Sequence, residues 1–206
     1  MGGLIFIIPT VATTLILLLT GKIEYSTNLF IVLFVFISYA LIGFFDDYIS
    51  IKRKRNKGLS QFQKLLLQFV VALIFYILFR EYTNGDSILE VTLLGIEWDL
   101  NWFYGVFILL LLVGSSNAVN LTDGLDGLAS ILTYPILIGL FIVGKLIENE
   151  LLVISSLSIF FSISGFLMFN YHPAMIFMGN IGSHTLGATI AIISILSKTE
   201  ALLIVM

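Results

Sequence analysis

Long apolar segments follow one another along almost the whole sequence, and this pattern constrains the fold more than any other feature. Of the 206 residues, 59% are hydrophobic and only 11% are charged, and the mean hydropathy is +1.08. A helix needs about 20 consecutive apolar residues to cross the core of a bilayer. Because windows of that kind recur from end to end, the sequence predicts an all-α, polytopic transmembrane helix bundle.

Seven apolar segments can be delimited, although several of them are short for a membrane span. Their approximate bounds are 4–19, 29–45, 65–79, 103–119, 128–143, 151–169 and 183–196. We therefore expect about seven spans within a single integral membrane domain that covers residues 1–206. The sequence has no cysteine, which excludes disulfides and zinc sites built from thiolates.

Basic residues are concentrated between the second and third apolar segments. Six of the ten lie there: Lys52, Arg53, Lys54, Arg55, Lys57 and Lys64. Lys and Arg are enriched in cytoplasmic loops and are attracted to anionic lipid headgroups. Residues 46–64 therefore predict a cytoplasmic basic loop, and alternation of the spans places the Asn- and Asp-rich motifs on the same side.

The polar stretch 81–102 falls on the opposite side and predicts a small extracytoplasmic β-hairpin. An Asn-Gly pair at position 84 is a turn signal, and polar and apolar residues alternate over 88–96. Trp98 and Trp102 are expected at the membrane interface. The sequence assigns no chemical role to this loop.

Residues 115–129 contain polar side chains at every third position, which do not share one face of a straight helix. These residues are Asn117, Asn120, Asp123 and Asp126. The interleaved Gly124 and Gly127 indicate that a helix ends or restarts here, leaving backbone N–H groups free to meet an anion. The carboxylates instead favour a metal ion, a sugar hydroxyl or a cationic group. A bound metal phosphate or nucleotide would satisfy both tendencies.

Asp46 and Asp47 end the second apolar segment. A carboxylate at the bilayer centre costs roughly 2.5 to 3.5 kcal/mol, so the pair is expected at the interface or beside a hydrated cavity. Two interpretations of the pair are open. It is either the polar end of a helix, or a site that binds a metal ion or removes a proton next to a phosphate. Lys64 opens the next apolar helix against the helix dipole, which favours an anionic ligand there.

The connection 170–184 combines a helix stop with a helix start. Pro173 ends the preceding helix, and Gly179 with Gly182 allows a tight turn before the next one. Asn180 and Ser183 are predicted to cap that helix.

Phe177 and two histidines occur in the same connection. Phe177 is suited either to stacking on a base or to packing and interfacial anchoring. His172 and His184 have no partner at metal-ligand spacing, which favours structural roles for both.

Three motifs together carry a resemblance to a known family. They are Phe44-Phe45-Asp46-Asp47-Tyr48, the stretch 53–64, and Asn-Ala-Val-Asn-Leu-Thr-Asp-Gly-Leu-Asp-Gly-Leu-Ala at 117–129. The sequence resembles the polyprenyl-phosphate N-acetylhexosamine-1-phosphate transferases, which form glycosyltransferase family 4. Its motifs are most similar to the phospho-N-acetylmuramoyl-pentapeptide transferase branch, and the similarity extends over essentially the whole chain.

The resemblance implies a reaction and a location. Phospho-MurNAc-pentapeptide would pass from UDP-MurNAc-pentapeptide to undecaprenyl phosphate, giving lipid I and UMP with Mg²⁺ as cofactor. This step belongs to peptidoglycan synthesis, and thus to cell-wall biogenesis, cell division and cell shape. The family acts at the cytoplasmic face of the bacterial inner membrane. Its partners are these two substrates, membrane lipid and a second copy in a homodimer, without nucleic acid.

The resemblance also implies roles for individual residues. The catalytic residues would be Asp46 and Asp47, an acidic pair acting as base on the lipid phosphate, together with Lys64, Asp123 and Asp126. Substrate binding would fall to Asn120, to Asn170 and Phe177 in a uridine pocket, and to Gly179 and Ser183. The metal ligands would be Asn180 and Asp47.

The sequence departs from the family pattern in three ways. Asn180 occupies the position of an aspartate that binds magnesium, so the metal affinity is expected to fall. His184 stands where the family usually has an apolar residue. The chain opens at Met1 within a family motif and stops at Met206 before the histidine-rich cytoplasmic loop, so we expect it to lack both termini of a ten-span relative.

Two other functions compete with the transferase. The first is an impaired relative that only binds nucleotide, lipid or a partner, which Asn180 and the missing ends favour. The second is a transporter whose intramembrane acids form a relay. The acids of this sequence cluster at one face, however, and no paired broken helices are evident in two halves of the chain.

Overall fold

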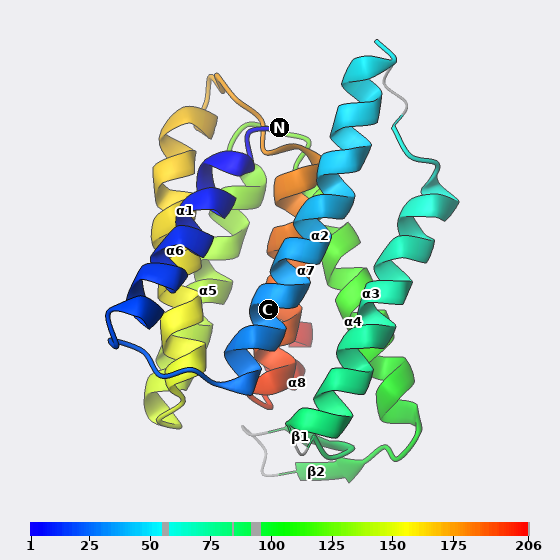
Figure 1. Cartoon of the computed structure of the whole chain (residues 1–206), viewed down its shortest axis with the longest axis vertical. Coiled ribbons are helices and arrows are strands. Elements are labelled where there is room, and N and C mark those ends of the chain that lie inside the picture. The colour runs from blue at the N-terminus through cyan, green and yellow to red at the C-terminus, as the bar shows by residue number, and fades with distance from the viewer. Residues whose placement is uncertain (55–57, 84, 92–95, 206) are drawn as a thin grey trace.

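The computed structural model describes residues 1–54, 58–83, 85–91 and 96–205. The helices within these ranges are α1 (Leu4–Leu19), α2 (Thr27–Lys52), α3 (Gln61–Tyr82), α4 (Phe103–Thr122), α5 (Leu128–Leu146), α6 (Glu150–Asn170), α7 (Gly179–Leu196) and α8 (Glu200–Val205). The long helices stand side by side as a bundle (Figure 1). The predicted all-α membrane fold is confirmed.

The number of candidate spans differs slightly from the expected seven. In the described part of the chain, 6 helices, α2 to α7, are long and apolar enough to cross a membrane. The first apolar segment forms α1 as expected, but its 16 residues measure only about 24 Å. That length is short of a bilayer core of about 30 Å.

Side chains set the starts of three helices. Ser26 accepts a hydrogen bond from the Leu29 amide at the start of α2. Ser60 and Gln63 form a reciprocal capping box at the start of α3, and the Asn149 side chain caps α6. Each satisfies an amide that would otherwise lack a partner in the first helical turn.

Helix α7 forms the centre of the bundle. It is buried over nearly its whole length and packs between α2 and α4. Helix α3 packs on the outer side of α2 and α4, helices α5 and α6 pack on each other, and α1 packs on α6. Close backbone contact needs small residues: a side chain at Gly43 would strike the backbone of α7, and one at Gly187 would strike α4. Asp46 of α2 is thereby held against the beginning of α7.

The predicted hairpin is present. Strand β1 (Ile88–Val91) pairs antiparallel with β2 (Ile96–Asp99), with Ile88 opposite Asp99. The strands join at 92–95, which, like the proposed turn residue Asn84, lies outside the described residues. Trp98 and Trp102 are exposed, as expected for interfacial anchors.

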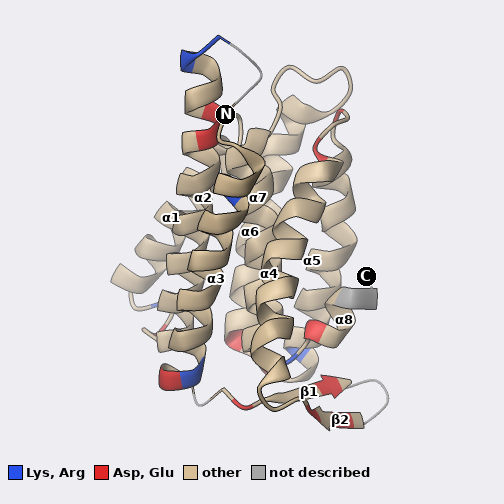
Figure 2. Ribbon diagram, turned by 90° about the vertical axis from the view of Figure 1, so that its right-hand side faces the viewer, with Lys and Arg blue, Asp and Glu red and all other residues tan. Residues whose placement is uncertain are grey.

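Charged residues gather at or near the two ends of the bundle (Figure 2). One end carries the hairpin, and the other carries the end of α2 and the start of α3 (Figure 1). Because α2 continues to Lys52 and α3 begins at Gln61, the connection is shorter than the predicted 46–64 loop. Lys52, Arg53 and Lys54 lie in the described part of this segment, whereas Arg55 and Lys57 fall outside it.

Candidate functional site

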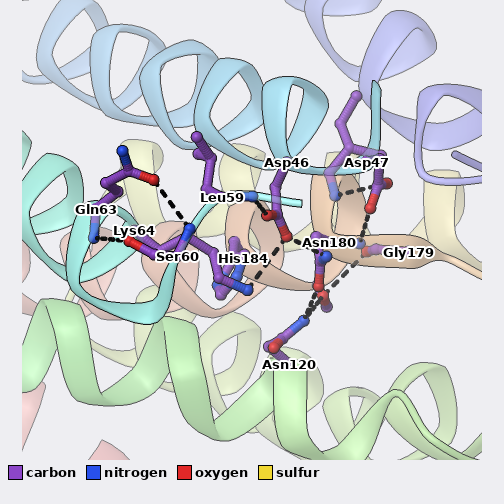
Figure 3. A network of polar contacts seen from close by, with 12 residues as sticks. Asp46, Asp47, Leu59, Ser60, Gln63, Lys64, Asn120, Gly179, Asn180 and His184 are labelled. Atoms are coloured by element: carbon purple, nitrogen blue, oxygen red, sulfur yellow. Dashed lines mark hydrogen bonds and ion pairs between the residues drawn. The ribbon is translucent and has the colours of Figure 1, made fainter. Parts of the chain in front are cut away.

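The three sequence motifs meet at the end of the bundle opposite the hairpin. The end of α2 supplies Asp46 and Asp47, and the end of α4 together with its connection to α5 supplies the Asn- and Asp-rich motif. The connection between α6 and α7 completes the group, and hydrogen bonds run between the three segments. Figure 3 shows part of this network from close by.

Asp46 is buried and bound by donors from two other segments. Its Oδ1 accepts from the Leu59 amide at 2.6 Å. Its Oδ2 accepts from Lys64 Nζ at 3.2 Å and from Asn180 Nδ2 (Figure 3). The tight turn before α3 is possible because residue 58 is glycine, where any side chain would overlap Asp46. The Lys64 charge, placed against the dipole of α3, is compensated by this carboxylate.

The beginning of α7 is capped from outside, which corrects the expectation that Asn180 and Ser183 cap it. The Asp47 carboxylate accepts from the Asn180 amide at 3.2 Å and from the Ile181 amide at 3.3 Å. Asp123 accepts from the Gly179 amide at 3.0 Å. Two carboxylates from α2 and from the end of α4 thus meet the positive end of a buried helix. Sequence spacing does not reveal caps supplied by other helices.

Asp123 is the titratable group of this site that stands just outside the spans. Burial raises its pKa from the usual 3.8 to about 6. The Gly179 amide opposes that rise, and the nearby charge of Asp47 adds to it. Asp123 is therefore poised to exchange a proton near neutral pH.

Asn120 links α4 to α7 through one nitrogen. Its Nδ2 donates to Asn180 Oδ1 at 2.7 Å and to Ser183 Oγ at 2.8 Å. The Ser183 hydroxyl in turn donates to the Gly179 carbonyl at 3.0 Å. These bonds orient the Asn180 amide so that its NH₂ group faces Asp46.

Asp126 lies at the edge of this group and ties two connections together. Its Oδ2 accepts from the Ala174 amide at 3.1 Å and lies 2.8 Å from His172 Nδ1. The Ala174 amide and His172 lower the pKa of Asp126. His172 itself is largely exposed, and its contact with Asp126 joins the α6–α7 connection to the α4–α5 connection, which agrees with a structural role.

Asn170 and Phe177 occupy different environments. Asn170 is buried; its Nδ2 donates to the Ile176 carbonyl at 2.9 Å, and its Oδ1 accepts from Ser130 at 3.3 Å. Phe177 is about half exposed and follows on the same connection. Asn170 therefore shapes the connection that presents Phe177, and the uridine-binding role implied for both stays a prediction.

A polar cavity lies beside Asp46, between the end of α2 and the start of α3. Its volume is about 750 Å³. The polar side chains along it include Asp46, Ser50, Arg53, Ser60, Gln63 and Lys64. Among the described residues, two cations and one carboxylate line this space, which suits an anion of modest size.

The residues that fit a divalent cation are Asp47 and Asp123. In the described part of the chain, no group of three or more His, Cys, Asp or Glu side chains is arranged to hold a metal. Asp46 is engaged by Lys64 and two other donors. Asp47 and Asp123 repel each other. Asp47 Oδ2 also lies 3.9 Å from the Met1 ammonium nitrogen, and each carboxylate retains lone pairs beyond these contacts. Asn180 Oδ1 is a neutral oxygen beside them.

Several site-forming residues had no sequence signal of function. The Leu59 and Ala174 amides act through their backbone, and Gly58 acts through the absence of a side chain. Gln68 and Ser116 are buried in apolar segments and contact His184. Polar residues inside predicted spans are the signal that would have found this last pair.

Comparison with known proteins finds a matching family model and several similar curated proteins. The family model for glycosyl transferase family 4 matches residues 29–198. Similar curated proteins named phospho-N-acetylmuramoyl-pentapeptide-transferase come from Bacillus pumilus (43% identical), Oceanobacillus iheyensis (42%) and Bacillus subtilis (42%). Each match covers 100% of this chain and 63% of the relative, so the chain spans about 63% of the length of these proteins.

Proposed function

The chain belongs to glycosyl transferase family 4, and we propose that it transfers phospho-MurNAc-pentapeptide from UDP-MurNAc-pentapeptide to undecaprenyl phosphate. The products are lipid I and UMP. The names of the relatives support the transferred group. The observation that carries the proposal is the cation-lined cavity at Asp46, which adjoins the carboxylates at the start of α7.

The acceptor phosphate is assigned to this cavity. Arg53 and Lys64 are the cations on its wall, and they would offset the charge of a phosphate monoester. Phe62, next to Gln63 on the wall, is 74% exposed and begins an apolar outer face of α3 that continues through Leu66 and Phe69. A polar cavity that adjoins a lipid-facing helix suits a phosphate on a polyprenyl tail.

The reaction is a phosphoryl transfer between two anions. An oxygen of the acceptor phosphate attacks the phosphorus on the sugar side of the diphosphate. The bond from that phosphorus to the bridging oxygen breaks, and UMP leaves with the bridging oxygen. Because both reactants are anionic, alignment and charge neutralisation supply most of the catalysis.

Asp46 and Asp123 have different parts in this proposal. Asp46 accepts from Lys64 and Asn180, so it positions the lysine at the cavity wall. Asp123 has a pKa raised to about 6 by burial, so it is the carboxylate best suited to take a proton from a protonated acceptor phosphate.

Magnesium is proposed as cofactor, with Asp47 as the charged ligand and Asn180 Oδ1 as a neutral one. When bound, the ion would offset the charge of the diphosphate. Asn180 contributes no negative charge, so the affinity for Mg²⁺ is expected to be lower than with an aspartate at this position. Asp126, Phe177 and the connection shaped by Asn170 are assigned to the nucleotide side.

The active face is proposed to be cytoplasmic, in the bacterial inner membrane. Lys52, Arg53 and Lys54 follow Asp47 at this end of the bundle, and cytoplasmic loops are rich in such residues. Lipid and the two substrates are the proposed partners, and a homodimer is a further proposal.

The test measures UMP release by the purified protein in detergent, given UDP-MurNAc-pentapeptide and a polyprenyl phosphate, with and without Mg²⁺. Asp47→Ala is the control variant, since it removes a charged ligand and the cap on α7. We expect Mg²⁺-dependent release that the variant abolishes. A folded protein that binds the nucleotide but releases no UMP would instead be a binding-only relative. The amide of Asn180, donating to Asp46 where an aspartate would add charge, favours that second candidate.

A further inference from the structure

A second polar layer lies inside the bundle, one helical turn below the Asp46 contacts. Gln68 of α3 follows Lys64 by four residues, and His184 of α7 follows Asn180 by four. Residues four apart on a helix lie on the same face, about 6 Å apart along the axis. Helices α3 and α7, which donate to Asp46 Oδ2 through Lys64 and Asn180, therefore each place a second polar side chain one turn further along. These side chains are Gln68 and His184.

The members of this buried layer are bonded to one another. His184 Nδ1 lies 3.2 Å from Gln68 Nε2 and 3.0 Å from Ser116 Oγ. Gln68 Oε1 accepts from Asn117 Nδ2 at 2.7 Å. Gln68, Ser116 and His184 are almost completely inaccessible to solvent. The layer thus joins α3, α4 and α7 within the apolar part of the bundle.

The hydrogen-bond directions favour one tautomer of His184. The Val113 carbonyl can only accept, and it receives Asn117 Nδ2 at 2.8 Å. The same NH₂ group donates to Gln68 Oε1, so the NH₂ group of Gln68 faces His184 and donates to Nδ1. Nδ1 is then an acceptor, and the proton of the neutral ring is on Nε2. That nitrogen is buried and has no partner among the described residues.

Helices α3 and α7 depend on such side-chain contacts for their spacing. Both pack against α2 and α4, which lie between them, and the Gln68–His184 bond reaches directly from one to the other. One turn above, Lys64 and Asn180 reach across the same interval to a single oxygen of Asp46 (Figure 3). A change in the distance between α3 and α7 at Gln68 and His184 would therefore pull Lys64 and Asn180 apart at Asp46.

We propose that His184, as the Nε2–H tautomer, is a positioning residue that sets the spacing of α3 from α7 and so places Lys64 on Asp46. Its Nδ1 accepts from the Gln68 amide, and the Ser116 hydroxyl lies 3.0 Å from the same nitrogen. His184 touches neither substrate nor metal in this role. Its catalytic consequence rests on the proposed transferase function, but the spacing role itself does not.

The variants are chosen so that one restores the acceptor. His184→Leu removes it and leaves the Gln68 amide and the Ser116 hydroxyl without a partner. His184→Asn places an oxygen three bonds from Cα, as Nδ1 is, and restores the acceptor. Thr185→Val is the matched control on the same helix, since Thr185 is buried and its hydroxyl bonds only within α7.

Two measurements on the full chain do not depend on activity. Nitrogen-15 spectra of the histidine rings would identify the protonated nitrogen of His184 after assignment with His184→Asn. Because the sequence has no cysteine, cysteines introduced at the exposed positions Phe62 and Met175 can carry spin labels. Their distance distribution reports the start of α3 relative to the connection that leads into α7.

We expect a protonated Nε2 in the unmodified ring, and a shifted or broadened distance in His184→Leu but not in His184→Asn or Thr185→Val. A proton on Nδ1, or an unchanged distance in His184→Leu, would overturn the proposal. In the UMP assay, His184→Leu should lower kcat/KM for the polyprenyl phosphate by roughly ten- to a hundredfold, with little change in KM for UDP-MurNAc-pentapeptide. The loss is expected although the family usually has an apolar residue here, because Gln68 and Ser116 of this chain lose their partner, and His184→Asn should recover most of it. If the unmodified protein releases no UMP, the transferase function fails, while the ring and distance measurements still decide the spacing role.

Discussion

The two ends of the bundle differ in the sign of the charge at their centre and in the groups that surround it. At the site end, the Asp46 carboxylate receives three donors and still faces a cavity of about 750 Å³. At the hairpin end, the central charge is a cation, Lys198. It contacts Asp86, the Ile88 carbonyl at 3.0 Å and Tyr104 Oη at 3.4 Å, and stands 4.8 Å from the centroid of the Tyr104 ring.

Each end also holds a carboxyl group whose pKa is raised by burial. Asp123 at the site end reaches about 6, and Glu200 at the hairpin end reaches about 7. Glu200 Oε1 accepts from Tyr104 Oη at 2.8 Å, and its Oε2 has no partner among the described residues. Asp123 instead has Asp47 beside it and a helix start that both carboxylates share.

The difference separates charge used for structure from charge available to a ligand. Lys198 is surrounded by groups of its own chain that tie α7 to the hairpin and to α4. The site end concentrates carboxylates against one helix start and leaves cations on a cavity wall. Burial alone therefore does not mark a site; buried charge beside a cavity does.

The largest contrast is expected from removing one carboxylate charge at each end. Asp46→Asn keeps the shape but loses the ion pair with Lys64, and transferase activity should fall by about 10²–10³-fold. Asp86→Asn weakens the contact with Lys198 and should leave activity within about twofold, because it is remote from the cavity. UMP release by both variants checks this contrast, and equal losses would contradict it.

Asn180→Asp tests whether the site end of the bundle binds a magnesium ion. A second carboxylate beside Asp46 should lower the melting temperature without Mg²⁺, because like charges repel. Mg²⁺ should restore stability and bind roughly tenfold more tightly than to the unmodified protein. Melting curves over a Mg²⁺ titration measure both effects. Glu200→Gln, at the far end, is the control that should show no Mg²⁺ dependence of its own.

Lys198→Met tests the hairpin end as a structural device. The methionine keeps most of the apolar volume but loses the contacts to Asp86 and Ile88 and the cation–π interaction, at a cost of about 1–2 kcal/mol. Hydrogen exchange should rise in β1 and β2, while UMP release should persist. Loss of activity without increased exchange would contradict a purely structural role.

The smallest expected effect is the pH dependence contributed by Asp123. Its folded pKa of about 6 lies above the usual 3.8, so folding favours the protonated form, and its contribution to stability is lost as pH rises from about 4 through 6. Asp123→Asn should remove this decrease in folding stability, because the asparagine amide does not ionise. The variant should gain at most about 1 kcal/mol relative to the unmodified protein between pH 4 and 7, after allowance for solvent screening.

Melting temperatures of both proteins across this range measure the gain. A gain that grows towards low pH would have the wrong sign. Addition of Mg²⁺ should reduce the gain, because a cation bound at the neighbouring Asp47 stabilises the ionised form of Asp123. Glu200→Gln provides the comparison at the hairpin end, where Mg²⁺ should change nothing.

Much of the architecture could be predicted because hydrophobic periods and helix stops are local. Apolar segment 4–19 became α1 with the same bounds, and Gly127, with φ +70°, separates α4 from α5. The end of α2 could not be predicted, because Asp46 and Asp47 look like a helix stop. They continue the helix to Lys52 instead, since α7 and the turn before α3 supply donors to both carboxylates.

The candidate site was only partly accessible from the sequence. Asp46 stood out because a carboxylate at the end of an apolar segment is costly without partners. Asp123 stood out through its spacing from the other polar residues of 117–126, and Asn180 through the family resemblance. The caps of α7 and the buried bond between Gln68 and His184 did not stand out. These contacts join residues on different helices, and no local spacing encodes such a pairing.

By itself, the sequence determined that this chain is a membrane helix bundle with its acidic and amide motifs at one end, because burial of backbone and apolar surface in lipid permits little else. The tertiary structure decided which donor meets which carboxylate. Asp46 is paired with Lys64 and Asn180, and Asp47 with the start of α7, because close packing of α2 on α7 at Gly43 leaves each carboxylate one set of partners.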